Sequence, residues 1–376
     1  MNDPLLTSGA AEIALHFGEE DVIDGLARNR ITLTKVKQNG NILTKQGGDG
    51  FQPRIEFKEA TRRYHDGTGA LSPSTVERWA NTTLHYKGVE ADNFLSLREW
   101  AANRDKRAQV VNIWDSIESG LKNDVSKTIN ESFYIDGPAT DDRAPDGMFS
   151  FMAYTQTLQD AATTPTARTA NIADPLGYSN DSYGGRDTDL AAYGGAWSGD
   201  YFTGSGTPTF DHYTPHIFRC KSTKFGGTSF EENSVKIIGA LARMQRRNKS
   251  DKKDSVKVVA LDGGMYESHS RRYDAKERVM VKEALGMPEY GHDQEGVKQD
   301  GLFIFWDFDC PENKGFAFAF ENITMRVMLD ELLMLDHDCP KWEGLQSGWY
   351  WIVRAMYQND YGTPRNYGYL DNTYSN

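Results

Sequence analysis

The sequence predicts an α+β fold in which a long helix and extended strands accompany a compact α/β segment. Three patterns predict it: a helical stripe of apolar residues between positions 110 and 133, a run of helix and buried strand over 230–308, and strand-like alternation at 54–60 and 349–362. Apolar residues at every third or fourth position indicate an amphipathic helix, whereas alternation at every second position indicates a half-buried strand. Because one chain of 376 residues carries both periods, it mixes helices and sheets.

The composition narrows the class of protein. The formal net charge of −12 disfavours a dedicated nucleic-acid binder, which usually carries a basic domain, and it favours solubility through self-repulsion. The three cysteines, Cys220, Cys310 and Cys339, are widely spaced, so they indicate a reducing compartment and no disulfide framework. The sequence shows no signal peptide and no run near the ~18 apolar residues of a membrane helix, so we expect a soluble protein without membrane contact.

Residues 1–45 have the pattern of a leading arm. Ala10–Leu26 has the spacing of a short amphipathic helix, and the polar stretch after it contains the turn signals Asn39–Gly40 and Gly47–Gly50. We therefore expect a flexible extension in front of the folded part.

An extended hairpin is expected next, over residues 51–92. Its strands are "RIEFKEA", which alternates polar and apolar residues, and "VERWANTTLHYKGVEAD", which is rich in threonine and aromatic residues. Between the strands lies a charged stretch that contains Arg62, Arg63, His65 and Asp66. This stretch is either a catalytic loop or an arm that contacts another molecule.

The catalytic interpretation of the hairpin tip starts from His65 and Asp66, since a neighbouring carboxylate can orient an imidazole as a general base. A mobile hairpin tip is a poor platform for chemistry that needs fixed geometry, and no nucleophile or oxyanion site accompanies it. We therefore expect these residues to be contact groups, and the protein not to be an enzyme.

The strongest helical pattern follows the hairpin. Its apolar stripe comprises Val110, Trp114, Ile117, Leu121, Val125, Ile129 and Phe133. Asn103 suits the N-cap, so the helix is expected to span about thirty residues, or about 45 Å, the length of a structural strut. Ser96 and Glu99 have the spacing of a capping box for a shorter helix before it.

The second half of the chain begins with weakly periodic loops and short strands at 160–230. The elements expected after them are a helix at Phe230–Arg247, a strand at Val256–Gly264, a helix at Met265–Gly286, a strand at Gly301–Phe308, and long strands at Phe316–Leu329 and Trp349–Gly362.

Motifs for common chemistry do not appear in the sequence. It contains no phosphate-binding loop, no GxSxG elbow, no HExxH helix and no EF-hand loop. The segment Asp336–Cys339 offers oxygen, nitrogen and sulfur donors, but adjacent residues of a strand point to opposite faces and cannot converge on one metal ion. We expect no catalytic residue, no cofactor and no metal site.

In their order, these elements resemble the major capsid proteins of tailed bacteriophages, which have the Hong Kong 97-type coat protein fold. The resemblance runs from about Ile31 to Leu370. It rests on the hairpin, the long helix with the "YIDG" turn after it, "YGGRDTDLAAYGGAW", "KVVALDGGMYESHSRRYDAKERV", "WDFDCPENKGFAFAFENITMRVM" and "WYWIVRAMYQNDYGTPRNYGYL".

The resemblance implies a division of the chain. It places an N-terminal arm at 1–45, an extended loop at 46–95, a peripheral domain with a spine helix at 96–230, an axial α/β domain at 231–325, and peripheral-domain strands that return to the axial domain at 326–376.

The resemblance also implies a function. The chain would assemble with itself into hexamers and pentamers of an icosahedral shell that encloses double-stranded DNA, in a virion assembled in the host cytoplasm. Scaffolding, portal and decoration proteins are further partners that it allows. Since the family's extended loop overlaps a neighbouring subunit, we expect Arg62 and Arg63 to meet carboxylates there.

Two alternatives stay open at this point. The same fold could form an encapsulin-type compartment that holds an enzyme cargo, although the polar N-terminal arm and the chain length favour the phage. A soluble hydrolase that uses clustered Asp and His residues belongs to a different class, and the absence of a nucleophile in the sequence disfavours it.

Overall fold

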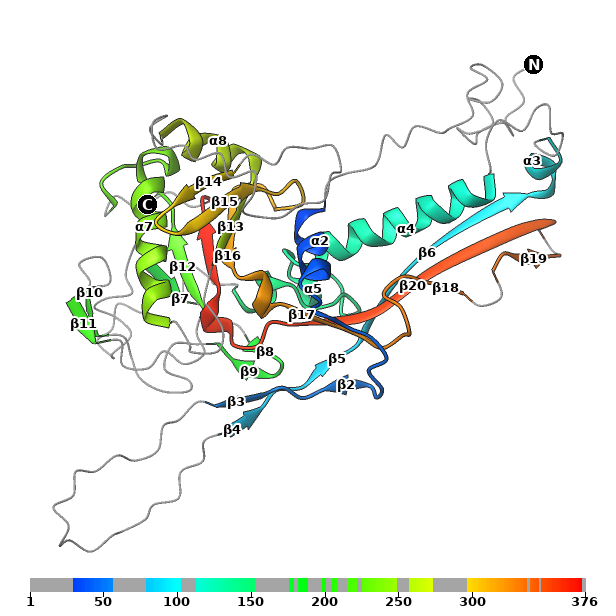
Figure 1. Cartoon of the computed structure of the whole chain (residues 1–376), viewed down its shortest axis with the longest axis horizontal. Helices are drawn as coiled ribbons and strands as arrows, with labels where there is room; N and C mark the ends of the chain where they lie inside the picture. The colour runs from blue at the N-terminus through cyan, green and yellow to red at the C-terminus, as the bar shows by residue number, and fades with distance from the viewer. Residues whose placement is uncertain are drawn as a thin grey trace, which may run out of the picture.

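A computed structural model describes residues 30–56, 79–102, 113–152, 176–178, 182–188, 198–200, 205–207, 215–221, 225–248, 257–272, 296–336, 339–344 and 346–373. These residues form an α/β lobe and a long projection, which we call the blade. Figure 1 shows the blade extending from one side of the lobe, with the base of a hairpin projecting close to where the two parts meet.

The blade is a sheet that carries a helix along one face. Strands β6 (Lys87–Ser96) and β20 (Gly348–Asp360) pair antiparallel along all ten residues of β6. The other strands of this sheet are β17 (Thr324–Val327), β18 (Met334–Leu335) and β19 (Lys341–Glu343), which pair with β20, and β1 (Ile42–Leu43), which lies parallel to β17. Helix α4 (Ile113–Ser132) covers what we call the upper face of the sheet (Figure 1).

Alternation along the strands explains why α4 packs there. The odd-numbered residues Trp351, Val353, Ala355 and Tyr357 of β20 belong to one buried cluster with the α4 stripe. Within that stripe, Leu121, Val125, Ile129 and Phe133 are buried, and Trp114 and Ile117 pack against them. The predicted stripe is thus confirmed for the described residues. The expected start at Asn103, like Val110, lies outside them, and the twenty described residues of α4 span about 30 Å.

The lobe is built on a seven-stranded mixed sheet. In spatial order its strands are β14 (Gly296–Gln299), β15 (Leu302–Trp306), β13 (Val258–Leu261), β16 (Lys314–Phe318), β21 (Gly368–Asp371), β12 (His216–Arg219) and β7 (Leu176–Tyr178). Its strands come from both sides of 231–325, the range that the resemblance assigns to an axial domain, because β7 and β12 precede that range and β21 follows it.

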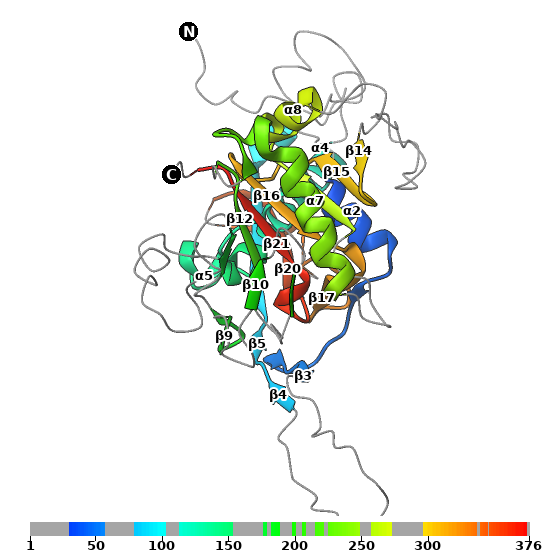
Figure 2. The same cartoon turned by 90° about the vertical axis from the view of Figure 1, so that its left-hand side faces the viewer.

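Both faces of the lobe sheet are covered. Helices α7 (Phe230–Asn248) and α8 (Gly263–Arg272) lie against one face, where Leu302 and Ile304 of β15 join their buried cluster (Figure 2). The intervening Phe303 and Phe305 point the other way, into the cluster shared with the blade. Strands β13 and β15 read as apolar runs in the sequence for this reason. The predicted helix at 230–247 and the two buried strands are confirmed.

The base of the extended hairpin is described, and it is antiparallel as predicted. Strand β3 (Arg54–Glu56) pairs with β4 (Trp79–Asn81), and β2 (Gly50–Phe51) pairs with β5 (Leu84–His85). Residues 57–78 lie outside the described part.

The short helix α3 (Leu97–Ala102) begins with the predicted capping box. The Ser96 N–H and hydroxyl donate to the Glu99 carboxylate at 3.2 and 3.0 Å, and the Glu99 N–H donates to Ser96 Oγ at 3.2 Å.

The remaining described elements are short. They are α5 (Gly137–Thr140), η1 (Met148–Phe151), β8 (Ser182–Tyr183), β9 (Arg186–Asp187), β10 (Ser198–Asp200), β11 (Ser205–Thr207), η3 (Phe320–Asn322) and η4 (Pro364–Asn366). The described part of 160–230 thus consists of short strands, as predicted. Within the described ranges, no helix has the length and apolar character needed to cross a bilayer.

The expectation of a flexible extension over residues 1–45 is wrong for its described part. Residues Ile31–Gln38 form helix α2, whose Ile31, Leu33 and Val36 are buried in the main cluster. Eight residues are too few for a helix that is stable alone, so tertiary contacts must hold it. The amphipathic pattern at Ala10–Leu26 lies outside the described residues.

The expectation of one long strand at Phe316–Leu329 is also wrong. The segment divides into β16 in the lobe and β17 in the blade, with η3 between them. Asn41 Nδ2 donates to the Phe320 carbonyl at 2.9 Å, which satisfies an acceptor exposed by the turn. The sequence alternates on both sides of this break, so its periodicity does not reveal the break. The helix expected at Met265–Gly286 is described only as far as Arg272.

A buried polar network, which we call the joint, connects α2, α4 and the lobe. The Asp307 carboxylate, just after β15, accepts hydrogen bonds from Thr32 Oγ1 at 2.9 Å and Tyr134 Oη at 2.6 Å. Its other oxygen accepts from the Asp309 N–H at 3.1 Å. Asn130 of α4 accepts from the Leu33 N–H at 3.0 Å and donates to Asp309 at 2.6 Å.

Burial raises the pKa of Asp307 above its ordinary value of 3.8, and the hydrogen bonds from Tyr134, Asp309 and Thr32 oppose that shift. The folded protein therefore holds a proton on Asp307 more readily than the unfolded chain does. This contribution to stability is complete below pH 3.8 and is lost as pH rises through the raised folded pKa.

We predict that Asp307→Ala lowers the free energy of unfolding at neutral pH by about 2 kcal/mol, because buried donors lose their acceptor. The loss of stability should be larger below pH 3.8 and shrink as pH rises, because only the wild type has the Asp307 carboxyl group, whose pKa is raised by folding. Urea denaturation at a series of pH values measures both effects. The control Asp330→Ala removes an exposed carboxylate and should stay within about 0.5 kcal/mol of wild type. A loss of stability that grows with pH would contradict a raised pKa of Asp307 in the folded protein.

Candidate interaction surfaces

The predicted contact residues Arg62, Arg63, His65 and Asp66 lie outside the described residues. What the structure describes is the base from which their loop extends and the blade surface next to it. The candidate site is therefore built from these two parts.

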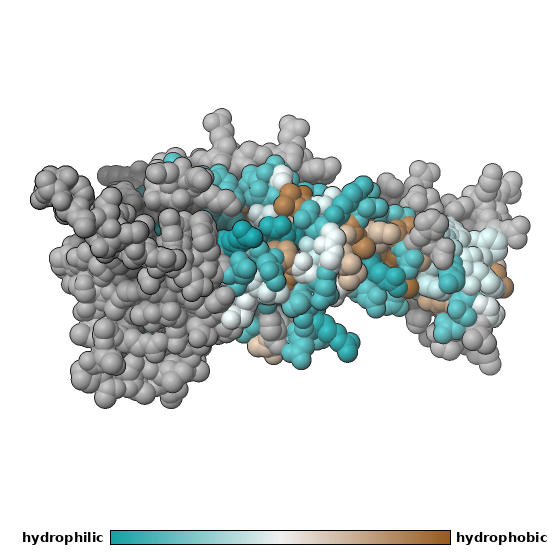
Figure 3. Space-filling model, turned by 90° about the horizontal axis from the view of Figure 1, so that it is seen from below, coloured by the Kyte–Doolittle hydropathy of each residue, from teal (hydrophilic) through white to brown (hydrophobic). Residues whose placement is uncertain are grey.

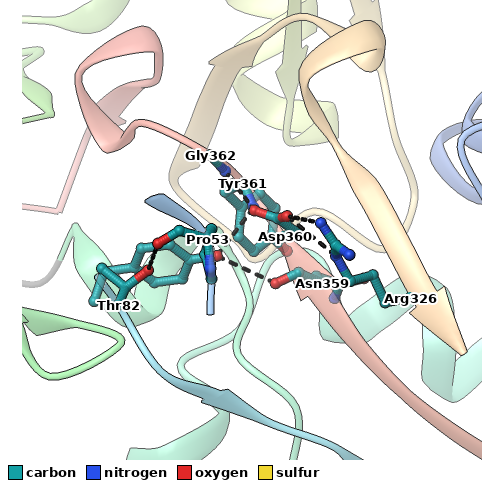
Figure 4. Close-up of polar contacts among 8 residues, drawn as sticks. Pro53, Thr82, Arg326, Asn359, Asp360, Tyr361 and Gly362 are labelled. Carbon is teal, nitrogen blue, oxygen red and sulfur yellow. Dashed lines mark hydrogen bonds and ion pairs between the residues drawn. The ribbon is translucent and has the colours of Figure 1, made fainter. Parts of the chain in front are cut away.

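Arg326 of the blade sheet lies between the end of β20 and the base of the hairpin. Arg326 of β17 donates from Nε and Nη2 to one oxygen of Asp360, at 3.3 and 3.1 Å, and the other oxygen accepts from the Gly362 N–H at 3.0 Å. Figure 4 shows Asp360 between these two donors. The Arg326 guanidinium also lies 4.4 Å from the centroid of the Phe51 ring in β2. One arginine therefore connects the blade sheet to the hairpin.

A second attachment comes from the turn between β8 and β9. The Thr83 N–H donates to the Gly184 carbonyl at 3.1 Å, and the Tyr183 hydroxyl donates to the Asn359 carbonyl and accepts from the Tyr361 N–H. Gly184 has a φ of +58°, and a Cβ there would meet the Thr82 side chain at 2.8 Å, so glycine suits this close approach. Across the hairpin, the Thr82 N–H and hydroxyl both donate to the Pro53 carbonyl (Figure 4).

The lower face of the blade, opposite α4, carries the even-numbered residues of β6 and β20. Across the strands Tyr350 faces Phe94, and Arg354 faces Glu90. Gly348 leaves room for the Phe94 ring, which would otherwise meet a Cβ. Met328, next to this sheet, is 39% exposed. Figure 3 shows hydrophobic patches on this face between hydrophilic ones.

Charged side chains lie between the apolar residues of the lower face. Arg354 pairs with Glu90 at 3.4 Å and with Asp336 at 2.9 Å, and the side chains of these residues are between 31% and 68% exposed. Exposed ion pairs add little stability. This trio is therefore better suited to the specificity of a contact than to the stability of the sheet. The hairpin base lies on the same face, because Arg326 is also even-numbered and covers Phe51.

Tryptophans gather at the far end of the blade. Trp349 has ring centroids 5.1 Å from Trp100, 5.7 Å from Trp114 and 4.8 Å from Trp342, and Trp114 lies 5.0 Å from Trp351. Trp342 remains 46% exposed, and Leu97, the first residue of α3, is 42% exposed. The period of two in "WYWIV" predicted the strand, but nothing local in the sequence brings Trp100 and Trp342 to it.

The segment that offered metal donors takes up structural contacts instead. Asp336 is part of the Arg354 trio, and Cys339 Sγ accepts from the Ile352 N–H at 3.3 Å. His337 and Asp338 lie outside the described residues. Within the described ranges, no group of three His, Cys, Asp or Glu side chains is placed to hold a metal ion.

Three solved capsid structures are similar to this chain over almost its whole length. For the capsid asymmetric unit of cyanophage A-1(L), the identity is 11% and the TM-score 0.58, over 94% of this chain and 95% of that chain. For the capsid of a native GTA particle, the identity is 11% and the TM-score 0.54, over 93% of each chain. For the mature capsid of bacteriophage PhiM1, the identity is 10% and the TM-score 0.51, over 94% of this chain and 90% of that chain. No family model and no curated protein matches the sequence.

These similarities establish the fold. The chain has the α+β fold of phage capsid structures, and the resemblance that the order of motifs predicted is confirmed at that level. At 10–11% identity this likeness is one of fold and does not extend to individual side chains.

We predict that Arg326→Ala loosens the hairpin base. Losing the Asp360 ion pair and the contact with Phe51 should cost about 1.4 kcal/mol, so backbone amides of 50–51 and 79–86 should exchange hydrogen about tenfold faster. Hydrogen exchange with mass spectrometry measures this. Arg354→Ala is the matched control on the same face, since its partners lie away from the hairpin, and it should leave these amides unchanged. Equal acceleration in both variants would count against the attachment.

Proposed function

We propose that this protein is the major capsid protein of a tailed bacteriophage, which assembles with itself into hexamers and pentamers of an icosahedral shell around double-stranded DNA. The observation that carries the proposal is the capsid fold, shared over at least 90% of both chains with the three structures above. A structural subunit of a virion needs no active site. The encapsulin-type alternative is not favoured by these likenesses, and neither is a hydrolase.

The shape of the chain supports self-association. A blade whose lower face and tip expose Met328, Trp342 and Leu97 does not bury its own apolar surface completely. Neighbouring copies in a closed shell would cover such surfaces, and symmetry repeats each contact in every copy. The family's Hong Kong 97-type division into arm, extended loop, peripheral and axial domains belongs to this proposal, with the blade as peripheral and the lobe as axial domain.

Within this proposal, the extended loop of one copy lies on the lower face of a neighbour's blade. The loop leaves from the side on which that face lies, and the face offers carboxylates at Glu90 and Asp92. Arg62 and Arg63 of the loop carry the complementary charge. Pairs of this kind at the rim of a contact set register and partner choice more than affinity.

Electron microscopy of the expressed protein tests the function directly. We expect closed shells or hexameric rings, and we expect double-stranded DNA inside particles purified from infected cells. A monomer or a small discrete oligomer at every concentration would contradict a shell protein. Shells filled with an enzyme in place of DNA would favour the encapsulin-type compartment.

The double change Arg62→Glu and Arg63→Glu should prevent shell assembly while circular dichroism shows a folded subunit. Adding Glu90→Lys and Asp92→Lys to the same chain should restore assembly, because the attraction is re-established with opposite signs. The control Lys221→Glu with Lys298→Glu makes the same change in net charge on the lobe and should assemble. Normal assembly of the first variant, or failure of the charge swap to rescue it, would contradict this placement of the loop.

A further inference from the structure

Strand β6 forms one edge of the blade sheet. It pairs with β20 on one side, and within the described part of the chain no strand pairs with its other side (Figure 1). Because the Leu97 N–H donates to the Ser347 carbonyl at 2.8 Å, the odd-numbered residues of β6 direct their backbone groups toward β20. The even-numbered residues therefore direct their N–H and carbonyl groups outward. An open edge of ten residues can pair with a strand of another chain.

Side chains of the same chain close the half of this edge that lies toward the tip of the blade. Asn93 Oδ1 accepts a hydrogen bond from the Phe94 N–H at 2.7 Å, and the Glu99 carboxylate accepts one from the Ser96 N–H at 3.2 Å. Both N–H groups belong to even-numbered residues, so both would otherwise be open to a strand from another chain. Only the half of β6 before Asn93 is left for pairing.

The remaining half offers three outward residues, Gly88, Glu90 and Asp92. All three are exposed, and within the described residues none of their N–H groups has a hydrogen-bond partner. The exposure of Gly88, which has no side chain, means that the backbone itself is accessible there. These three residues are the part of β6 that can accept an antiparallel strand.

The backbone of this edge matches a second copy of itself, because two identical antiparallel strands are related by a two-fold axis. In the register that pairs the three outward residues with one another, Glu90 lies opposite Glu90 of the second copy. A shift by two residues places Glu90 opposite Asp92 of the second copy. Side chains that lie directly opposite are about 5 Å apart on one face of the sheet, and like charges in that position destabilise the pairing.

The charges beside the open half of the edge do not cancel. Arg354 pairs with Glu90 at 3.4 Å and with Asp336 at 2.9 Å, so two carboxylates share one guanidinium. Asp92 has no ion-pair partner within the described residues. Each copy therefore brings three carboxylates and one guanidinium to the lower face at this edge, which is a net charge of −2.

We propose that the β6 edge is a strand-pairing surface for a second copy of this chain, and that Glu90 and Asp92 block this pairing by charge repulsion. The two carboxylates keep free subunits from joining edge to edge, so self-association is left to other contacts. This inference does not depend on the shell function, because the edge and its carboxylates belong to the single subunit.

Removal of the two charges tests the proposal in the full-length protein. The changes are made in the Arg62→Glu, Arg63→Glu variant, so that the loop contact proposed above does not contribute. Adding Glu90→Gln and Asp92→Asn gives what we call the neutral variant, which should associate about tenfold more tightly than its parent in analytical ultracentrifugation. Hydrogen exchange with mass spectrometry should show new protection at residues 88–92 as its concentration rises. The parent should show no such protection.

A proline control distinguishes strand pairing from a general effect of charge. Glu90→Pro with Asp92→Asn, in the same parent, removes the same two charges and also the outward N–H of residue 90. Strand β20 does not use that N–H, and proline is tolerated at such edge positions, so circular dichroism should show an intact fold. This proline variant should associate no more tightly than the parent.

Three results would overturn the proposal. They are equal association of the proline and neutral variants, protection of residues 88–92 in the parent, and no protection of these residues in the neutral variant. If the proline variant does not fold, the protection of residues 88–92 in the neutral variant still decides. All these results are read at the β6 edge of a loop variant, so they are separable from the test of shell assembly.

Discussion

A buried carboxylate at the joint between lobe and blade is the constraint on which the rest of the structure depends. Asp307 is fully buried and accepts hydrogen bonds from α2, from Tyr134 just after α4 and from its own loop. A buried charge is costly unless donors surround it, so the three segments must meet in one arrangement for the fold to be stable. Because hydrogen bonds to a charged group contribute about 1.5–3 kcal/mol each, this arrangement resists small displacements.

The joint determines how the blade projects. Helix α4 starts far out on the blade, but Asn130 near its other end and Tyr134 just after it are fixed to the lobe and to α2. The sheet follows the helix, because Tyr357 of β20 shares a hydrogen bond of 2.8 Å with Ser132 and buries its ring in the same cluster. A thin projection that is fixed at one end and partly apolar at the other suits contacts with neighbours better than independent stability.

Sequence periodicity predicted the elements whose contacts are repeated along the chain. The α4 stripe, the helix at 230–248, the apolar strands of the lobe and the long strand β20 each bury residues at their own regular spacing. Helix α2 escaped prediction because Asn130 and Asp307, far away in sequence, stabilise it. The break at η3 escaped because Phe318, Phe320 and Ile323 are all buried, so the apolar pattern continues through the turn. The joint itself unites positions 32, 130, 134, 307 and 309, and no local pattern marks such a set.

Strand β20 connects the candidate interaction surfaces described above. Trp349 and Trp351 support the apolar tip, Arg354 holds the charged trio of the lower face, and Asp360 attaches the hairpin base through Arg326. These groups are carried by one continuous strand of thirteen residues, which pairs with β6 along most of its length. A strand within a sheet is stiff, so the tip, the lower face and the hairpin base keep fixed positions relative to one another. In the proposed shell, where each copy would meet several neighbours at once, that stiffness would allow a contact at the tip to orient the loop at the other end.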